Sequence, residues 1–274
     1  LHVVRYEAPV RRTAVNFRPS LCIAAQGRKR VFLEEQAYVY DADRFLIVAA
    51  PLPMELEIEA SESEPFLAAV LHIDPAVVSE LVLALADEAP VALDADAGVA
   101  VHASAVTEGL RSALIRLLRA VRSPVDSRIL APTLVREILY FVLRSDQGAQ
   151  LRALAPSNSQ AHRVTAIIQH LDQHYEQPFN IPTLAQRAGM SESVFHQAFK
   201  TVTLMSPLQY IKRIRLHRAR IMIVGQGLKA GEAAFKVGYA NASQFSREFK
   251  RLFGVQPSRA ADSLRYLQPP RADH

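Results

Sequence analysis

The feature that most constrains the fold is a helical pattern that occurs twice in the C-terminal half of the chain. The copies run over 184–200 and 233–250, and each has a short helix, a glycine, a polar residue and a second helix. Gly189 and Gly238 suit the left-handed backbone that lets two helices meet at a sharp angle. Ser191 and Asn241 are favoured N-cap residues. We therefore expect two helix-turn-helix units, at about 181–202 and 230–253.

The segment between the two copies predicts one long helix. Ser206 supplies an N-cap and Pro207 suits the first turn, and apolar residues recur at helical spacing as far as Ile223. A helix of about 18 residues rises about 27 Å, whereas one turn of DNA measures about 34 Å. This length favours an arrangement in which the outer helices of both units reach successive grooves on one face of a duplex.

Charge divides the chain near the same place. Residues 158–274 carry 16 Lys and Arg against 7 Asp and Glu, a net charge of +9, whereas residues 1–157 carry 16 against 20. A basic half indicates a polyanionic partner, although basic surfaces also occur on proteins that bind none. The connecting helix contributes five cations and no acid: Lys212, Arg213, Arg215, Arg218 and Arg220. We expect Arg215 to lie toward the core-facing side of this helix and to have a structural role.

The N-terminal half has a different pattern. Residues 20 to about 73 contain short runs rich in β-branched and aromatic residues, and Met54 to Glu59 alternate strictly between apolar and acidic. Such runs predict an antiparallel barrel or sandwich with one wet face. After Asp74 the spacing becomes helical. One predicted helix carries an apolar stripe along one side: Leu130, Leu134, Ile138 and Phe141. This stripe could form a subunit interface or could pack on the barrel of its own chain.

Length and composition set the outer limits. A chain of 274 residues fits about two domains, and we place them at 1–154 and 161–270 with a linker at 155–160. Cys22 is the one cysteine, which fits a reducing cytoplasm, and no apolar run is long enough to span a membrane. We therefore expect a cytoplasmic protein with no membrane partner.

The chain resembles the AraC/XylS family of transcriptional regulators. Residues 160–266 resemble its double helix-turn-helix domain through Leu184-Ala185, Gly189-Met-Ser191, Ser206-Pro207, Ser243-Gln-Phe245 and Gly254-Val-Gln-Pro257. Residues 17–150 resemble the cupin-like N-terminal domain of one branch through Pro19-Ser-Leu-Cys22, Tyr38-Val-Tyr-Asp41 and Arg136-Glu-Ile-Leu-Tyr140. The implied fold is α+β: a cupin-like antiparallel β-barrel with flanking helices, then an all-α double helix-turn-helix domain. Glu34-Glu35 departs from the branch, which usually turns on glycines.

The resemblance also implies residues that contact DNA. Glutamine can pair with adenine and arginine with guanine, whereas a solvated helix face is the alternative for the whole set. The base-contacting candidates are Ser193, His196, Gln197, Ala242, Ser243, Gln244 and Arg247. For contacts to phosphate, the candidates are Lys200, Lys212, Arg213, Lys250 and Arg251.

A small-molecule effector is expected in the barrel, because ligand sites favour barrel mouths. We assign it to Cys22, Tyr38, Tyr40 and Met54. Tyr38 and Tyr40 share one strand face. Cys22 is either a small buried residue or a thiol that senses an aldehyde or another electrophile, and the second role requires access and a lowered pKa.

Taken together, the sequence predicts a bacterial DNA-binding regulator that senses a small molecule and is not an enzyme. Its expected partners are double-stranded DNA, an effector, a second copy of itself and RNA polymerase, with no cofactor or metal. One alternative is a cupin-fold metalloenzyme with a basic helical C-terminal domain. Against this alternative, the histidines of this chain before the linker do not have the close His-x-His spacing of a cupin metal site. They are His2, His72 and His102. Another alternative is a regulator whose barrel only dimerises, which a dry interior without a cavity would favour.

Overall fold

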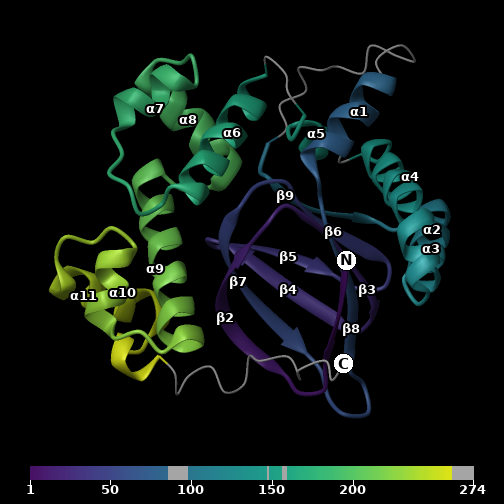
Figure 1. Cartoon of the computed structure of the whole chain (residues 1–274), viewed down its shortest axis with the longest axis horizontal. Helices are drawn as coiled ribbons and strands as arrows, with labels where there is room; N and C mark the ends of the chain where they lie inside the picture. The colour runs from purple at the N-terminus through teal and green to yellow at the C-terminus, as the bar shows by residue number, and fades with distance from the viewer. Residues whose placement is uncertain (86–97, 147, 156–158, 261–274) are drawn as a thin grey trace.

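The computed structural model describes residues 1–85, 98–146, 148–155 and 159–260. Strands form most of the N-terminal half and helices form the C-terminal half (Figure 1). The strands are β1 (His2–Tyr6), β2 (Val10–Phe17), β3 (Ser20–Gln26), β4 (Arg28–Leu33), β5 (Gln36–Tyr40), β6 (Arg44–Val48), β7 (Leu52–Glu59), β8 (Phe66–His72) and β9 (Val101–Ala105). The N-terminal helices are α1 (Pro75–Leu85), α2 (Glu108–Ala120), α3 (Pro124–Ile129), α4 (Ala131–Leu143) and α5 (Gly148–Arg152).

The strands form two antiparallel sheets, where the strand pattern led us to expect a barrel or a sandwich and the family resemblance a cupin-like barrel. In the described residues the sheets have the orders β1-β8-β3-β6-β9 and β2-β7-β4-β5. The antiparallel prediction is confirmed, but the sheets do not close into one barrel, because among the described strands no continuous ladder joins the edge strands of one sheet to those of the other. At the turn from β5 to β6, only an isolated bridge from Asp41 to Arg44 forms.

The predicted alternation along β7 is confirmed. Met54, Leu56 and Ile58 are buried, while the acidic residues between them point outward and pair with arginines on the neighbouring strands β2 and β4. One face of this sheet therefore packs on the other sheet, and the opposite face is wet.

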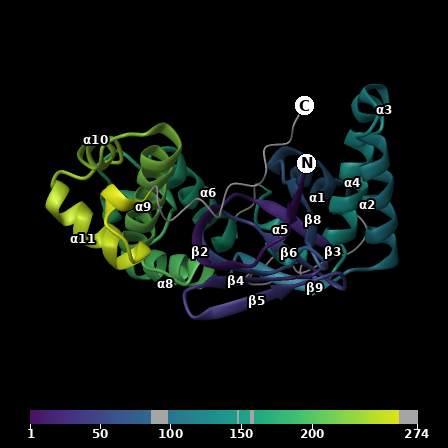
Figure 2. The same cartoon turned by 90° about the horizontal axis from the view of Figure 1, so that it is seen from below.

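Helices flank the sheets on two sides. Figure 2 shows α2, α3 and α4 on one side of the strands and the C-terminal helices on the other. Thr107 caps α2 by accepting a hydrogen bond from the Leu110 amide. Of the predicted stripe, Leu134 and Ile138 are buried in the domain's own core, whereas Leu130 is 48% exposed. The stripe therefore packs mainly on its own domain, and its N-terminal end remains at the surface.

The C-terminal half contains the two predicted helix-turn-helix units. Its helices are α6 (Gln160–Gln173), α7 (Ile181–Arg187), α8 (Glu192–Thr203), α9 (Pro207–Gln226), α10 (Ala230–Lys236) and α11 (Ala242–Phe253), followed by the 3-10 turn η1 (Pro257–Arg259). Gly189 and Gly238 have φ values of +63° and +85°, so both turns use the left-handed backbone expected of them. Ser206 closes a capping box at the start of α9. The predicted domain boundaries stay a prediction, since 156–158 and 261–270 lie outside the described residues.

The long helix α9 connects the parts of the molecule. Its first half, with Tyr210, Ile211 and Ile214, belongs to a core that continues through α6 and α8 into the two sheets. Its second half, from Leu216 onward, belongs to a separate core with α10 and α11. The first unit is therefore packed against the N-terminal domain, while the second has a core of its own.

Arg215 holds the second unit to the first. Its guanidinium donates to the carbonyl oxygens of Tyr175 at 2.7 Å, Gln177 at 2.9 Å and Gly238 at 3.0 Å. A Cβ at Gly238 would lie 2.4 Å from the Glu176 carbonyl oxygen. The expectation that Arg215 is structural is confirmed.

We predict that Gly238→Ala destabilises the chain much more than Gly254→Ala. Both glycines have positive φ, which costs an alanine about 1–2 kcal/mol, but no atom lies within 4 Å of a Cβ at Gly254. Gly238→Ala adds a backbone clash and should cost more than about 3 kcal/mol. Urea unfolding followed by circular dichroism measures both. Equal losses would contradict the packing described for Gly238.

Candidate nucleic-acid interface

The polar face of helix α8 is exposed to solvent, because the opposite face carries phenylalanines that are buried in the core. Ser191 caps the helix by accepting from the Val194 amide, and Phe195 and Phe199 are completely buried. On the outer face, the four predicted DNA-contacting side chains are exposed: Ser193, His196, Gln197 and Lys200.

Helix α11 repeats this arrangement. Asn241 caps it by accepting from the amides of Ser243 and Gln244, and Phe245 and Phe249 are completely buried. The predicted residues Ser243, Gln244, Arg247, Lys250 and Arg251 are exposed, whereas Ala242 is half-buried. The two outer helices lie at opposite ends of α9 (Figure 1).

Glu248 joins α11 to α9 and was not identified from the sequence. Its carboxylate accepts from Lys212 Nζ at 2.7 Å, Tyr239 Oη at 2.8 Å and Gln244 Nε2 at 3.2 Å. Partial burial acts in the opposite direction, but these hydrogen bonds hold the pKa of Glu248 below its usual range. Lys212, expected at phosphate, is therefore engaged in a contact between helices.

The other cations of α9 also have partners inside the molecule. Arg213 Nη2 lies 2.9 Å from Glu34 Oε2 on the β4–β5 turn, and Arg218 pairs with Asp172 of α6 at 2.9 Å. Arg220 donates to the Ala14 carbonyl oxygen on the edge strand β2. The expectation that Arg213 faces phosphate does not fit this conformation, because its guanidinium is used between the domains. Sequence spacing alone could not reveal partners so distant in the chain.

The four predicted effector residues lie in the core between the sheets. Cys22, Tyr38, Tyr40 and Met54 are each at most 7% exposed. Burial raises the pKa of the Cys22 thiol, so the access and the lowered pKa required of a sensing thiol are both missing here. The alternative role of Cys22, a small buried residue, fits the structure better.

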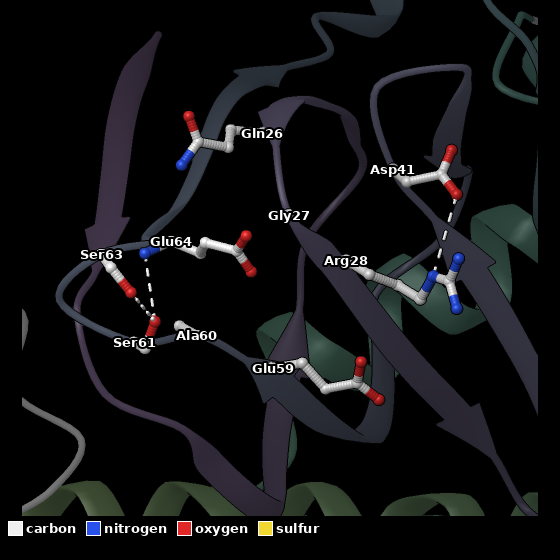
Figure 3. Close-up of a pocket in the computed structure, with 9 residues that line it drawn as sticks. All are labelled: Gln26, Gly27, Arg28, Asp41, Glu59, Ala60, Ser61, Ser63 and Glu64. Carbon is white, nitrogen blue, oxygen red and sulfur yellow. Dashed lines mark hydrogen bonds and ion pairs between the residues drawn. The ribbon is translucent and has the colours of Figure 1, made fainter.

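An open cleft lies at one end of the two sheets (Figure 3). It has a volume of about 930 Å³ and is lined by Gln26, Gly27, Arg28, Asp41, Glu59, Ala60, Ser61, Ser63 and Glu64. Three carboxylates line it, and Arg28 lies 3.9 Å from Asp41. None of the four predicted effector residues lines this cleft.

Comparison with known families identifies the chain. Residues 1–150 match the family model of the AraC-type transcriptional regulator N-terminus, which covers more than half of the 274 residues, and 184–263 match a helix-turn-helix domain. The chain belongs to the AraC-type transcriptional regulators. This AraC-type regulator thus combines the N-terminal domain of that family with a DNA-binding helix-turn-helix domain.

Relatives of this AraC-type regulator are themselves named as regulators. SoxS of Salmonella typhimurium is 32% identical over 95 residues, which are 35% of this chain and 89% of SoxS. RclR of Escherichia coli is 33% identical over 107 residues, but these are only 39% of this chain and 38% of RclR. ToxT from Vibrio cholerae shares the fold, with a TM-score of 0.62, 11% identity and coverage of 95% and 97% of the two chains.

Two further observations bear on the alternatives. Across the described ranges, no three His, Cys, Asp or Glu side chains are grouped so that they could hold a metal ion. In the same part of the chain, no helix has both the length and the apolar character that a bilayer crossing requires.

We predict that Lys212 and Lys250 of this AraC-type regulator differ in how they affect salt-dependent DNA binding. Each phosphate contact contributes about 0.9 to the slope of log K against log salt. Lys250→Ala should lower that slope by about 0.9, whereas Lys212→Ala should leave it unchanged, because Lys212 is paired with Glu248. Fluorescence anisotropy with duplex DNA at several salt concentrations gives both slopes. An equal loss in Lys212→Ala would show that the pair opens on DNA.

Proposed function

We propose that this chain is a ligand-responsive regulator that reads DNA with both outer helices at once. The observation that carries this proposal is the exposure of matching polar faces on α8 and α11 at the two ends of α9. The 20 residues of α9 span about 30 Å along the helix axis, which is close to the length of one turn of DNA. In this proposal, Ser193, His196 and Gln197 read one major groove and Ser243, Gln244 and Arg247 read the next.

Arg247 is the sharpest test of base reading. An exposed arginine on a recognition helix can bind guanine O6 and N7 in a bidentate manner. We expect Arg247→Ala to weaken binding to the preferred sequence by about 1–3 kcal/mol and to relax the preference at one base position. Selection from a random duplex library, followed by anisotropy on the enriched sequence, measures both effects.

Lys250→Ala is the matched control for that experiment. A phosphate contact carries no sequence information, so this variant should weaken all duplexes alike and keep the preferred sequence. If Arg247→Ala behaves as Lys250→Ala does, Arg247 contacts the backbone and the proposed base reading by α11 is wrong.

We further propose that the N-terminal domain binds a small organic effector. ToxT structures include one with a bound unsaturated fatty acid, which supports a ligand site in a domain of this fold. The contact that would carry the signal is Glu34 with Arg213. Glu34 has φ +54°, a backbone conformation that favours glycine. A strained position that also supplies an interdomain ion pair favours a role in coupling.

Dimerisation through α3 and the start of α4 is the third part of the proposal. Val125, Ile129 and Leu130 are 58%, 62% and 48% exposed, and they lie beside a groove of about 480 Å³. Arginines and acids both line this groove: Arg116, Arg119, Asp126 and Glu137. A patch with both signs of charge around apolar residues can complement a second copy of itself across a two-fold axis. RNA polymerase as a partner and a cytoplasmic location belong to the same proposal.

We predict that Ile129→Glu weakens self-association at least about tenfold, because it places a charge where an apolar side chain worth about 1.5–3 kcal/mol would be buried. Analytical ultracentrifugation over a range of concentrations measures this change. Leu83→Glu is the matched control, since Leu83 on α1 is 74% exposed and lies outside the proposed patch. A monomeric wild-type protein at micromolar concentration would refute the dimer.

A further inference from the structure

A lysine is buried between the two sheets without an acidic partner. Lys29, on β4, is only 7% exposed, and the charged form of its amine is favoured by the Cys22 thiol rather than by a carboxylate. Its Nζ instead lies 5.6, 5.8 and 6.0 Å from the ring centroids of Phe17, Tyr40 and Phe66. Burying an unpaired charge is strongly unfavourable, so packing alone gives no reason to keep a lysine here.

The choice of lysine at this position also stands out in the sequence. Residues 1–157 contain 16 Lys and Arg, and all of them except Lys29 are arginine. Arginine stays charged in proteins, whereas a buried lysine can lose its proton and act as a nucleophile. Burial lowers the pKa of Lys29. The one lysine of this half therefore occupies a place where the neutral form of its amine is favoured.

A buried tyrosine hydroxyl, which can donate a proton, lies opposite Lys29 on the neighbouring strand. Tyr40 is its partner in the β4–β5 ladder, and the buried Tyr40 hydroxyl has the Cys22 thiol as its polar neighbour. Burial raises the pKa of Tyr40 well above its usual value, so the phenol keeps its proton. An amine and a protonated phenol, with the Cys22 thiol beside them, thus belong to one buried compartment.

The open cleft of Figure 3 adjoins this compartment. Gly27 and Arg28, which line the cleft, directly precede Lys29 on the chain. A Cβ at Gly27 would lie 3.3 Å from Cδ2 of Phe66, and the Phe66 ring is one of the three around Lys29 Nζ. Phe66 therefore contacts both the cleft wall and the lysine compartment, and a movement of its ring would join the two.

The geometry points to Lys29 as the covalent anchor of a carbonyl effector, a small aldehyde or ketone with an apolar body, which it binds reversibly as an imine. This inference rests on the proposed effector-binding role of the N-terminal domain. The amine nitrogen attacks the carbonyl carbon and gives a carbinolamine. Tyr40 then protonates the hydroxyl, which leaves as water while the C=N bond forms, and the phenolate takes back the proton from nitrogen. No oxidant or reductant is required.

A carbonyl compound fits the surroundings better than an anion does. Three carboxylates line the cleft, namely Asp41, Glu59 and Glu64, and they disfavour a negatively charged ligand. An anion would also lose its hydration on entering the apolar compartment, whereas an aldehyde or ketone enters uncharged. A non-covalent anion at Lys29 is therefore the competing outcome of the test.

The position of Lys29 connects this site to the DNA-binding half. Lys29 and Tyr40 pair at the open end of the β4–β5 hairpin, and Glu34 at its tip pairs with Arg213 of α9. A covalent adduct that displaces the strands at one end thus acts on the element that contacts α9 at the other.

Reductive trapping on the full-length protein tests the inference. The protein is incubated at neutral pH with benzaldehyde and sodium cyanoborohydride, which reduces an imine to a stable secondary amine, and the modified lysines are mapped by mass spectrometry. Because burial lowers the pKa of Lys29, a larger fraction of its amine is neutral at this pH than for an exposed lysine. We expect Lys29 to be modified faster than the exposed Lys236. Modification of Lys236 with none at Lys29 overturns the inference.

Thermal unfolding provides the second readout. Benzaldehyde should raise the unfolding temperature of wild type and of Lys236→Met, but not of Lys29→Met. Stabilisation by benzoate that requires Lys29, with none by benzaldehyde, would overturn the imine and assign Lys29 to a non-covalent anion. DNA binding by the untreated protein is measured separately. A protein that binds DNA but is not labelled at Lys29 refutes this inference alone, whereas loss of DNA binding refutes the proposed function.

Discussion

The burial of α9 along most of its length is the constraint on which the rest of the structure depends. Tyr210 on its first half donates to the Pro51 carbonyl oxygen at 2.8 Å, and its second half forms the core of the second unit. Between these parts His217 is buried, and burial lowers its pKa to about 3, so it stays neutral. One helix therefore packs against the N-terminal domain through its first half and against α10 and α11 through its second half, which fixes their relative positions.

The net positive charge of the C-terminal half suggested more cations available to DNA than the structure leaves free on α9. Arg213, Arg215 and Arg218 bind acids or carbonyl oxygens of other elements. Exposed cations of the C-terminal half include Lys200 on α8 and Arg247, Lys250 and Arg251 on α11, where phenylalanines occupy the opposite face of each helix. The charges along α9 thus hold elements of the molecule together, and in the proposed DNA complex the contacts come from the exposed cations at its two ends.

Besides the Tyr210 hydrogen bond to Pro51, polar contacts of the N-terminal domain with α9 arise from the edge strand β2 and the β4–β5 hairpin. Arg220 donates to the Ala14 carbonyl oxygen, and Glu34 pairs with Arg213. An effector alters DNA binding only to the extent that it favours one arrangement of these contacts over another. The hairpin is well suited to this role because its open end carries Lys29 and Tyr40 in the core.

Local sequence determined the features that depend on near neighbours: the helix caps at Ser191 and Asn241, the glycine turns, the buried phenylalanine faces and the alternation of β7. These follow from backbone sterics and periodicity within a few residues. Tertiary structure alone decided that the strands form two sheets, that Lys212 meets Glu248 and Arg213 meets Glu34, and that Lys29 is buried. The physical reason is that ion pairing and burial depend on which distant segments pack together, and a single sequence pattern does not encode that packing locally.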